Sequence, residues 1–267
     1  MDNVVIASNQ EDARAAAAVE QHHAQMAGAL ALRVEALVAA AARQDLASGE
    51  SARRALVEWC EHDLVPQALA EEKAMYPAAQ AKPEGRLLVD GMLAEHKVIT
   101  GLVESVAATT DVVRAAAASK ALLVAFESHL AKENDLVLPL LVAAPDVSVA
   151  DLLGGMHELL GGQTEHEHAH EESASTGCGG HTCGCGEVDG PGYPELDARA
   201  VPHAIRHATI FGALDSVPPG GGLVLVAPHD PLPLLAQVEQ RYSSAFDVDY
   251  LERGPEAWRL SFARRPA

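Results

Sequence analysis

The stretch SHLAKEND, residues 128–135, decides the fold because it places two polar side chains on an apolar helical face. His129 and Glu133 lie four residues apart in it. Apolar residues continue the same face on both sides: Leu122, Phe126, Leu136 and Leu140. This spacing predicts a helix whose apolar face points into the protein. Because an unpaired carboxylate and imidazole are costly to bury, we expect a further group to compensate for them.

The composition narrows the class of protein. Only 4% of the 267 residues are aromatic and Ala is abundant, which favours packed helices over a β-sandwich. The formal net charge is −19, which argues against nucleic acid or an anionic membrane surface as a partner. We find no apolar run long enough to span a bilayer and no secretory signal, so we expect a cytoplasmic protein.

Four long helical patterns occupy the first part of the chain. They run from about 10 to 43, from 51 to 76, from Pro83 to 106 and from a cap at Thr110 or Asp111 to 142. A capping box of Ser148 and Asp151 begins a short fifth helix that ends near 160. Amphipathic helices with short connections predict an all-α, up-down-up-down four-helix bundle.

The composition changes twice after this bundle. Residues 161–192 are rich in Gly, Ser, Glu and His without apolar periodicity, and we interpret them as a flexible linker. Residues 193–267 alternate strand and helix patterns, which predicts a small α/β domain, βαββ or, as we expect, βαβαββ. The predicted organisation is therefore a bundle over 1–160, the linker and a small C-terminal domain.

The bundle repeats itself. QALAEEKAMYP (67–77) aligns with HLAKENDLVLP (129–139), which places Glu71 on Glu133 with a proline six residues after each. HAQMAGAL (23–30) aligns in the same way with HKVITGLV (96–103). The bundle is therefore predicted to consist of two helix hairpins related by a pseudo-two-fold axis.

The repeat also indicates a site. Its equivalent polar positions all lie on inward stripes, and side chains four residues apart return to nearly the same face of a helix. Three histidines and two glutamates buried together predict a metal centre, and imidazole with carboxylate favours iron or manganese, often as a carboxylate-bridged pair. The five residues of this predicted centre are His23, Glu71, His96, His129 and Glu133. The alternative is that their side chains are hydrogen-bonded core residues.

These residues resemble the haemerythrin-like (HHE cation-binding) family over about residues 15–145. The resemblance implies a four-helix bundle with a non-haem di-iron centre. It also implies that the five residues just named are the iron ligands. Gln67 stands where the family pattern has His. We therefore expect one iron to be weakly held, open to external ligands, or absent.

The linker contains a second group of metal-ligating side chains. The sequence CGGHTCGC provides Cys178, His181, Cys183 and Cys185. Thiolates and imidazole suit zinc or another soft metal, or redox chemistry. The alternative is a polar tether that happens to contain thiols.

The C-terminal part contains the segment ELDARAVPHAIRHATIFGALDSVPPGGGLVLVAPHDPLPLLAQV. This segment resembles a small α/β family of uncharacterised function, related to the TusA/SirA-like sulfur carriers. Members of that family are often joined to haemerythrin-like domains. The carriers have a nucleophilic Cys after the first strand, whereas RAVPHAIRH has none, so persulfide transfer is excluded at that position. His207, His229 and Asp230 form a candidate ligand or metal site. The alternative is that Asp230 caps a helix and the histidines lie on the surface.

Together these features predict a cytoplasmic non-haem (di-)iron protein that binds or processes O₂, NO or peroxide. The resemblance implies a role in sensing or in the oxidative or nitrosative stress response, with a protein partner at the C-terminal domain. A second hypothesis is a labile-iron handling or iron-centre repair protein. A third is a structural bundle without metal.

Overall fold

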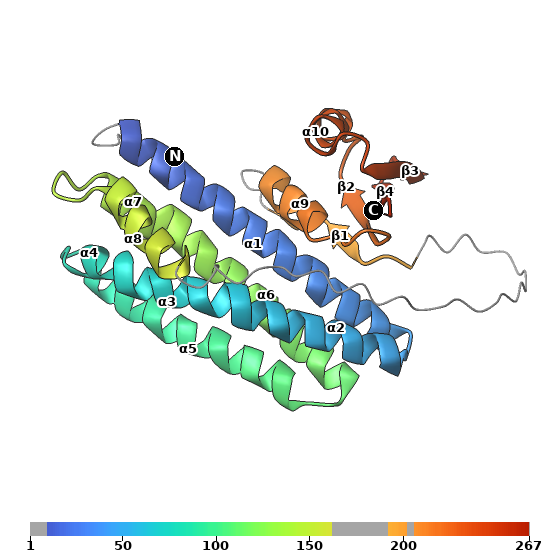
Figure 1. Ribbon diagram of the computed structural model, residues 1–267, viewed down its shortest axis with the longest axis horizontal. Coiled ribbons are helices and arrows are strands. Elements are labelled where there is room, and N and C mark those ends of the chain that lie inside the picture. Colours follow the sequence, from blue (N-terminus) through green and yellow to red (C-terminus); the bar gives the residue numbers. More distant parts are fainter. Residues whose placement is uncertain (1–9, 162–191, 202–205, 267) are drawn as a thin grey trace, which may run out of the picture.

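The computed structural model describes residues 10–161, 192–201 and 206–266 of the chain. A helical bundle forms the first of these ranges, and a four-stranded sheet with two helices forms the remainder (Figure 1). The predicted all-α bundle followed by a small α/β region is confirmed. The main bundle helices are α1 (Gln10–Ala42), α2 (Leu46–Trp59), α3 (Val65–Ala74), α5 (Arg86–Ala108) and α6 (Val112–Lys132). Further segments complete it: α4 (Tyr76–Gln80), α7 (Leu138–Val142), α8 (Val149–Gly161) and the π-helical turns η1 (Cys60–Leu64) and η2 (Glu133–Val137).

Side-chain caps determine where the bundle helices begin. Asp111 accepts hydrogen bonds from two backbone N–H groups of the first turn of α6, which confirms this predicted cap. The backbone N–H of Asp151 donates to Ser148 Oγ at the start of α8, as the capping box predicts. Helix α2 begins at Leu46 rather than near Ser51, because Asp45 accepts a hydrogen bond from the Ser48 N–H.

Each π-helical turn ends two residues before a proline. Pro66 and Pro139 are each the second residue of the α-helical segment that follows the turn. A proline has no N–H to donate and its ring clashes with the carbonyl four residues earlier, so a widened turn lets the helix continue. In both turns the backbone bond spans five residues, from Val65 N–H to the Cys60 carbonyl and from Leu138 N–H to the Glu133 carbonyl.

The second π turn corrects one prediction about the inward face. After Glu133 the buried leucine and valine positions are Val137, Leu138, Leu141 and Val142, whereas Leu136 is 50% exposed and Leu140 is only partly buried. The expectation that Leu136 and Leu140 continue the face of His129 was therefore wrong. A strict helical repeat does not hold across a π turn, which adds one residue to the turn.

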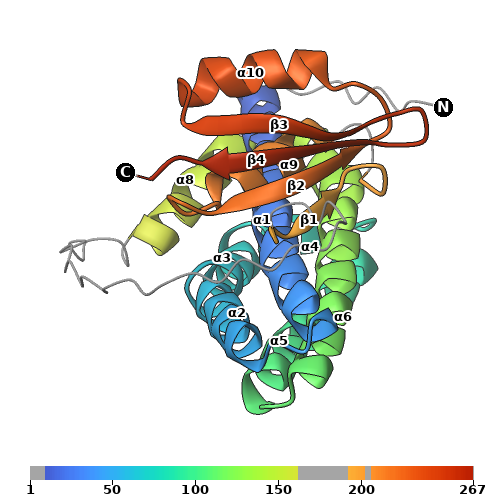
Figure 2. The same ribbon diagram turned by 90° about the vertical axis from the view of Figure 1, so that its right-hand side faces the viewer.

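The C-terminal part has the predicted βαβαββ order. Its elements are β1 (Glu195–Asp197), α9 (Arg206–Asp215), β2 (Gly222–Ala227), α10 (Leu232–Tyr242), β3 (Phe246–Arg253) and β4 (Trp258–Arg264). The strand order is β1-β2-β4-β3, with β1 parallel to β2 and the other pairs antiparallel (Figure 2). Every residue of β2 is buried, which suits a central strand covered on both faces.

Helix α9 packs directly against α1, between α1 and the sheet (Figures 1 and 2). Two glycines allow this approach, because a Cβ on Gly28 would lie 2.0 Å from the Thr209 carbonyl oxygen and one on Gly212 would lie 2.4 Å from that of Gln25. Apolar residues of both parts belong to one continuous core, for example Leu30 of α1 and Ile210 of α9.

Burial on both sides explains the apolar character of α1. By length and composition this helix could cross a membrane, so the expectation that no segment reaches that size was wrong. Of its most apolar stretch, 56% is buried inside the protein. The bundle covers one side of the helix and α9 covers another, as befits a central core helix.

Candidate metal centre

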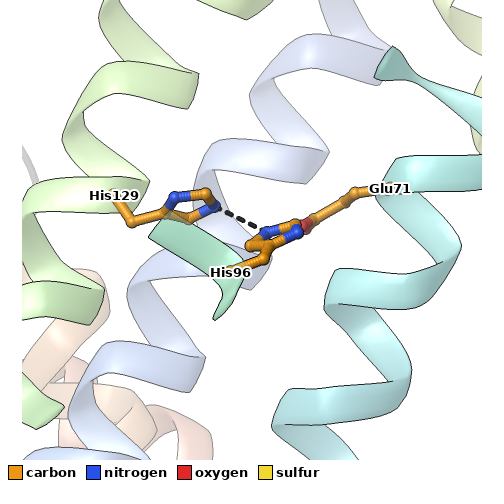
Figure 3. Close-up of side chains that lie close together, drawn as sticks. All are labelled: Glu71, His96 and His129. Carbon is orange, nitrogen blue, oxygen red and sulfur yellow. Dashed lines mark hydrogen bonds and ion pairs between the residues drawn. The ribbon is translucent and has the colours of Figure 1, made fainter. Parts of the chain in front are cut away.

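Five buried side chains from four separate stretches of the bundle converge on one point. His23 comes from α1, Glu71 from α3, His96 from α5 and His129 from α6, and Glu133 is the first residue of η2. None is more than 5% exposed. Figure 3 shows Glu71, His96 and His129 directed toward one another, with 2.9 Å between the Nε2 atoms of the two histidines. The structure therefore brings together all five residues that the repeat singles out.

The ligand atoms form two adjacent groups that share Glu71. We call the group of Glu71, His96 and His129 position one, and the group of His23, Glu71 and Glu133 position two. Within each group, one ligand atom per residue lies within 4.8 Å of the others. Two donor groups with a common carboxylate have the form of a dinuclear site.

Each carboxylate directs one oxygen to each position. Glu71 Oε1 lies 3.5 Å from His23 Nε2, and its Oε2 lies 3.6 Å from His96 Nε2. Glu133 Oε2 lies 3.6 Å from His23 Nε2, and its Oε1 lies 3.8 Å from His129 Nε2. Both glutamates can therefore bridge a pair of cations.

Two atoms of position two are buried without a hydrogen bond. His23 Nε2 and Glu133 Oε2 have no hydrogen-bond partner among the residues that the structure describes. Leaving such atoms unsatisfied costs roughly 1–3 kcal/mol each. A cation between them would satisfy both, so the residues present fit a metal ion.

Outer partners orient all three histidines. The Nδ1 atom of His23 lies 2.8 Å from Asn134 Oδ1, that of His96 2.8 Å from Glu72 Oε1 and that of His129 3.1 Å from Glu95 Oε2. Because each of these oxygens can only accept, Nδ1 carries the proton and Nε2 faces the centre. Lys132 in turn donates to Glu95 over 2.7 Å.

Sequence reasoning missed these outer residues. Helical spacing places Glu72 off the inward stripe of Glu71, and the internal repeat does not single out Glu95 or Asn134. The available signal was adjacency, since Glu72, Glu95 and Asn134 each neighbour a member of the cluster in sequence. A residue next to an inward ligand flanks the site and can reach a ring from the side.

Tyr76 also belongs to the site, although the internal repeat does not single it out. Its hydroxyl donates to Glu133 Oε1 over 2.7 Å. The same oxygen lies 3.3 Å from His96 Nε2 and 3.2 Å from His129 Nε2. Gln67 also bonds within the cluster, where its Nε2 donates to Glu71 Oε1 over 2.9 Å.

Burial and mutual charge shift the pKa values in the cluster in opposite directions. Burial, aided by the charge of Glu71, raises the pKa of Glu133 to about 8. Burial, aided by His96, lowers the pKa of His129 to about 4. For His23 burial acts downward, but the neighbouring carboxylates of Glu71 and Glu133 outweigh it and raise the pKa to about 9. A bound cation would compete with protons for these side chains, so metal binding is expected to release protons.

The other predicted sites have different outcomes. Cys178, His181, Cys183 and Cys185 lie outside the described residues. His207 and His229 are exposed, and no metal-ligand group among the described residues includes them or Asp230. The alternative role of Asp230 as a helix cap was wrong, because Pro231 occupies the cap of α10 and Asp230 instead accepts a hydrogen bond from the Tyr250 hydroxyl.

Comparison with known proteins agrees with this geometry. Residues 14–141 match the family model of the hemerythrin HHE cation binding domain, and residues 195–264 match that of an uncharacterized conserved protein family (DUF2249). No curated protein and no solved structure matches the chain significantly. Both matches coincide with the regions in which the sequence resembles those families. The chain is therefore a fusion of a hemerythrin HHE domain, a metal-binding type of domain, with a C-terminal DUF2249 domain.

Proposed function

We propose that the bundle holds two non-haem iron ions at positions one and two, and that this centre binds or processes O₂, NO or peroxide. The observation that carries the proposal is the pair of buried carboxylates, Glu71 and Glu133, each with one oxygen toward each position. Iron supplies redox chemistry and affinity for such small molecules when bound. The protein supplies the donor atoms and buries them inside the bundle.

The two positions differ in a way that favours binding of an external ligand. Position one has two imidazoles, whereas position two has only that of His23. Gln67 stands where a second imidazole would lie, and its amide N–H is directed at Glu71. A site with fewer protein donors keeps an open coordination position, as catalytic metal sites do. We therefore assign position two as the side at which the small molecule binds.

The surroundings favour a small uncharged ligand. Buried apolar side chains flank the ligands along the same helices, among them Val19, Met26, Met92 and Phe126. Such walls exclude water and disfavour large or charged molecules.

A sensing role is supported by the position of α1. This helix carries His23 on one side and packs against α9 on another. A change at position two can therefore act on the C-terminal domain through a single rigid element. We propose that this domain presents the state of the centre to a protein partner in the cytoplasm, during an oxidative or nitrosative stress response.

Metal analysis tests the proposal. Protein purified anaerobically is expected to contain two irons per chain and to change its visible spectrum on exposure to oxygen. The variant with Cys178, Cys183 and Cys185 replaced by serine is the control, because any iron that it retains is bound outside the linker thiols. A protein whose bundle holds no iron under these conditions would contradict the proposal.

The alternative function, labile-iron handling or repair of iron centres, is favoured by the same weak position two. An ion held by one imidazole and shared carboxylates leaves more readily than one with a full donor set. Stoichiometric transfer of iron to an apo acceptor protein, faster than transfer to a chelator of equal affinity, would support this alternative over ligand binding.

Gln67→His is expected to raise the iron occupancy of position two and slow its loss to a chelator. The substitution adds a second imidazole at the position equivalent to His129 in the internal repeat. Iron per chain is measured before and after chelator treatment, with Gln80→His as the control because Gln80 is exposed and bonds only to Asp90 among the described residues. An unchanged occupancy would show that Gln67 does not border position two.

A further inference from the structure

Tyr76 occupies a place that packing alone would fill with a hydrocarbon side chain. In the internal repeat, position 76 corresponds to Leu138, and both residues are 1% exposed. The helix breaks at Met75, between the end of α3 and the start of α4, and the phenol ring projects inward at that break. A phenolic hydroxyl is costly to bury where leucine suffices, unless it has a partner there.

The partners of the hydroxyl are the donor atoms of the centre. Its oxygen lies 2.7 Å from Glu133 Oε1, 3.2 Å from His129 Nε2 and 3.3 Å from His96 Nε2. The two nitrogens are ligand atoms of position one, and Glu133 Oε1 is the oxygen directed toward that position. Tyr76 therefore faces position one and not position two.

When the two histidines are neutral, these atoms present mainly lone pairs to one another. Glu72 and Glu95 hold the protons of His96 and His129 on Nδ1, so in the neutral rings both Nε2 atoms present lone pairs. The two Nε2 atoms nevertheless lie 2.9 Å apart. The single proton of the hydroxyl is directed to Glu133, so it cannot bridge them. The phenolic oxygen of Tyr76, the two Nε2 atoms and Glu133 Oε1 are four lone-pair donors that converge on one point. This arrangement suits a cation.

We propose that Tyr76 is a metal ligand of position one, binding iron(III) through its phenolate oxygen. This inference rests on the proposed function, because it requires iron at the centre. The O–H bond of the phenol breaks, an oxygen–iron bond forms and one proton passes to the solvent, with no change in the number of electrons. A hard anionic oxygen favours the trivalent ion. Position one thereby gains a donor that position two lacks.

Such a ligand has a spectroscopic signature that imidazole and carboxylate lack. A phenolate bound to iron(III) absorbs visible light by charge transfer from ligand to metal, and excitation in that band enhances the vibrations of the tyrosinate ring. The wild-type protein loaded with iron(III) is expected to show both features. Deuterated tyrosine shifts the enhanced vibrations, which identifies a tyrosinate ligand without any substitution.

Tyr76→Phe is the decisive variant, and Tyr242→Phe is its matched control. Tyr242 bonds to Asp215 in the C-terminal domain, so its loss removes one phenol hydroxyl far from the cluster in sequence and in fold. The band per bound iron is expected to disappear in Tyr76→Phe and to persist in Tyr242→Phe. Circular dichroism and Tm establish that the variants are folded.

The outcomes separate this inference from the proposed function. If the wild-type protein binds iron without the phenolate band, or if Tyr76→Phe leaves the band unchanged, the ligand role of Tyr76 is overturned. The proposed iron centre is not affected by either result. Wild-type protein that binds no iron in the bundle overturns both. A deuterium-sensitive tyrosinate spectrum that depends on Tyr76 supports both.

Discussion

His129→Ala is expected to lose the iron of the bundle, with a fall in affinity of at least about 100-fold. The substitution removes one of the two imidazoles of position one and leaves Glu95 without its ring partner. Because both glutamates span the two positions, loss of one ion also removes the charge that holds the carboxylates in place for the other. Iron per chain after purification and a chelator challenge measures the effect.

His62→Ala is the matched control for this prediction. His62 is exposed in the first π turn, and its Nδ1 lies 2.8 Å from the Glu58 carbonyl oxygen. His62 is exposed whereas Glu71 is buried, so the two side chains lie on different faces of the helix. We expect the iron content of His62→Ala to equal that of the wild type. Equal loss in both variants, or in neither, would refute the assignment of the site to the inward stripes.

Gly28→Ala is expected to destabilise the whole protein by about 3 kcal/mol, with a Tm lower by roughly 10 °C. The added methyl group would lie 2.0 Å from the Thr209 carbonyl oxygen, so α1 and α9 must move apart. Backbone atoms of two long-range partners cannot yield as a flexible side chain does. Thermal unfolding followed by circular dichroism measures the change.

Gly91→Ala controls for the intrinsic effect of replacing a helical glycine. Gly91 is exposed within α5, and a Cβ there would meet no atom within 4 Å. This change is expected to stabilise the protein by about 0.5–1 kcal/mol, because alanine loses less backbone entropy in a helix. A neutral Gly28→Ala beside a stabilised Gly91→Ala would show that the α1–α9 contact contributes little to stability.

The internal repeat explains why so much could be predicted from the sequence. Helical spacing identified the inward stripes, and the repeated His and Glu positions then selected five residues that the structure brings together. Each of these residues lies on a regular α-helix or at its very end, where the angle per residue is known in advance. Local rules were therefore sufficient for them.

The predictions that failed concern features that local sequence rules do not describe. The inward face after Glu133 shifted because a proline forces a π turn, and the spacing of apolar residues alone does not show where the extra residue is absorbed. Tyr76 and Glu72 do not belong to the predicted set because a helix break and a lateral approach decide their contacts. The contact of α1 with α9 joins segments about 180 residues apart in the chain. The sequence indicates this contact only through two glycines, Gly28 and Gly212.

The position of α1 also determines how the molecule must fold. Leu30 of α1 and Ile210 of α9 belong to one apolar cluster, so neither part buries its own surface completely without the other. The bundle and the sheet domain therefore form a single cooperative unit rather than two independent foldons. We expect a bundle fragment and a sheet-domain fragment, produced separately, to associate through the buried contact of α1 and α9. A bundle fragment produced alone would present the apolar flank of α1 to water and would be prone to aggregate.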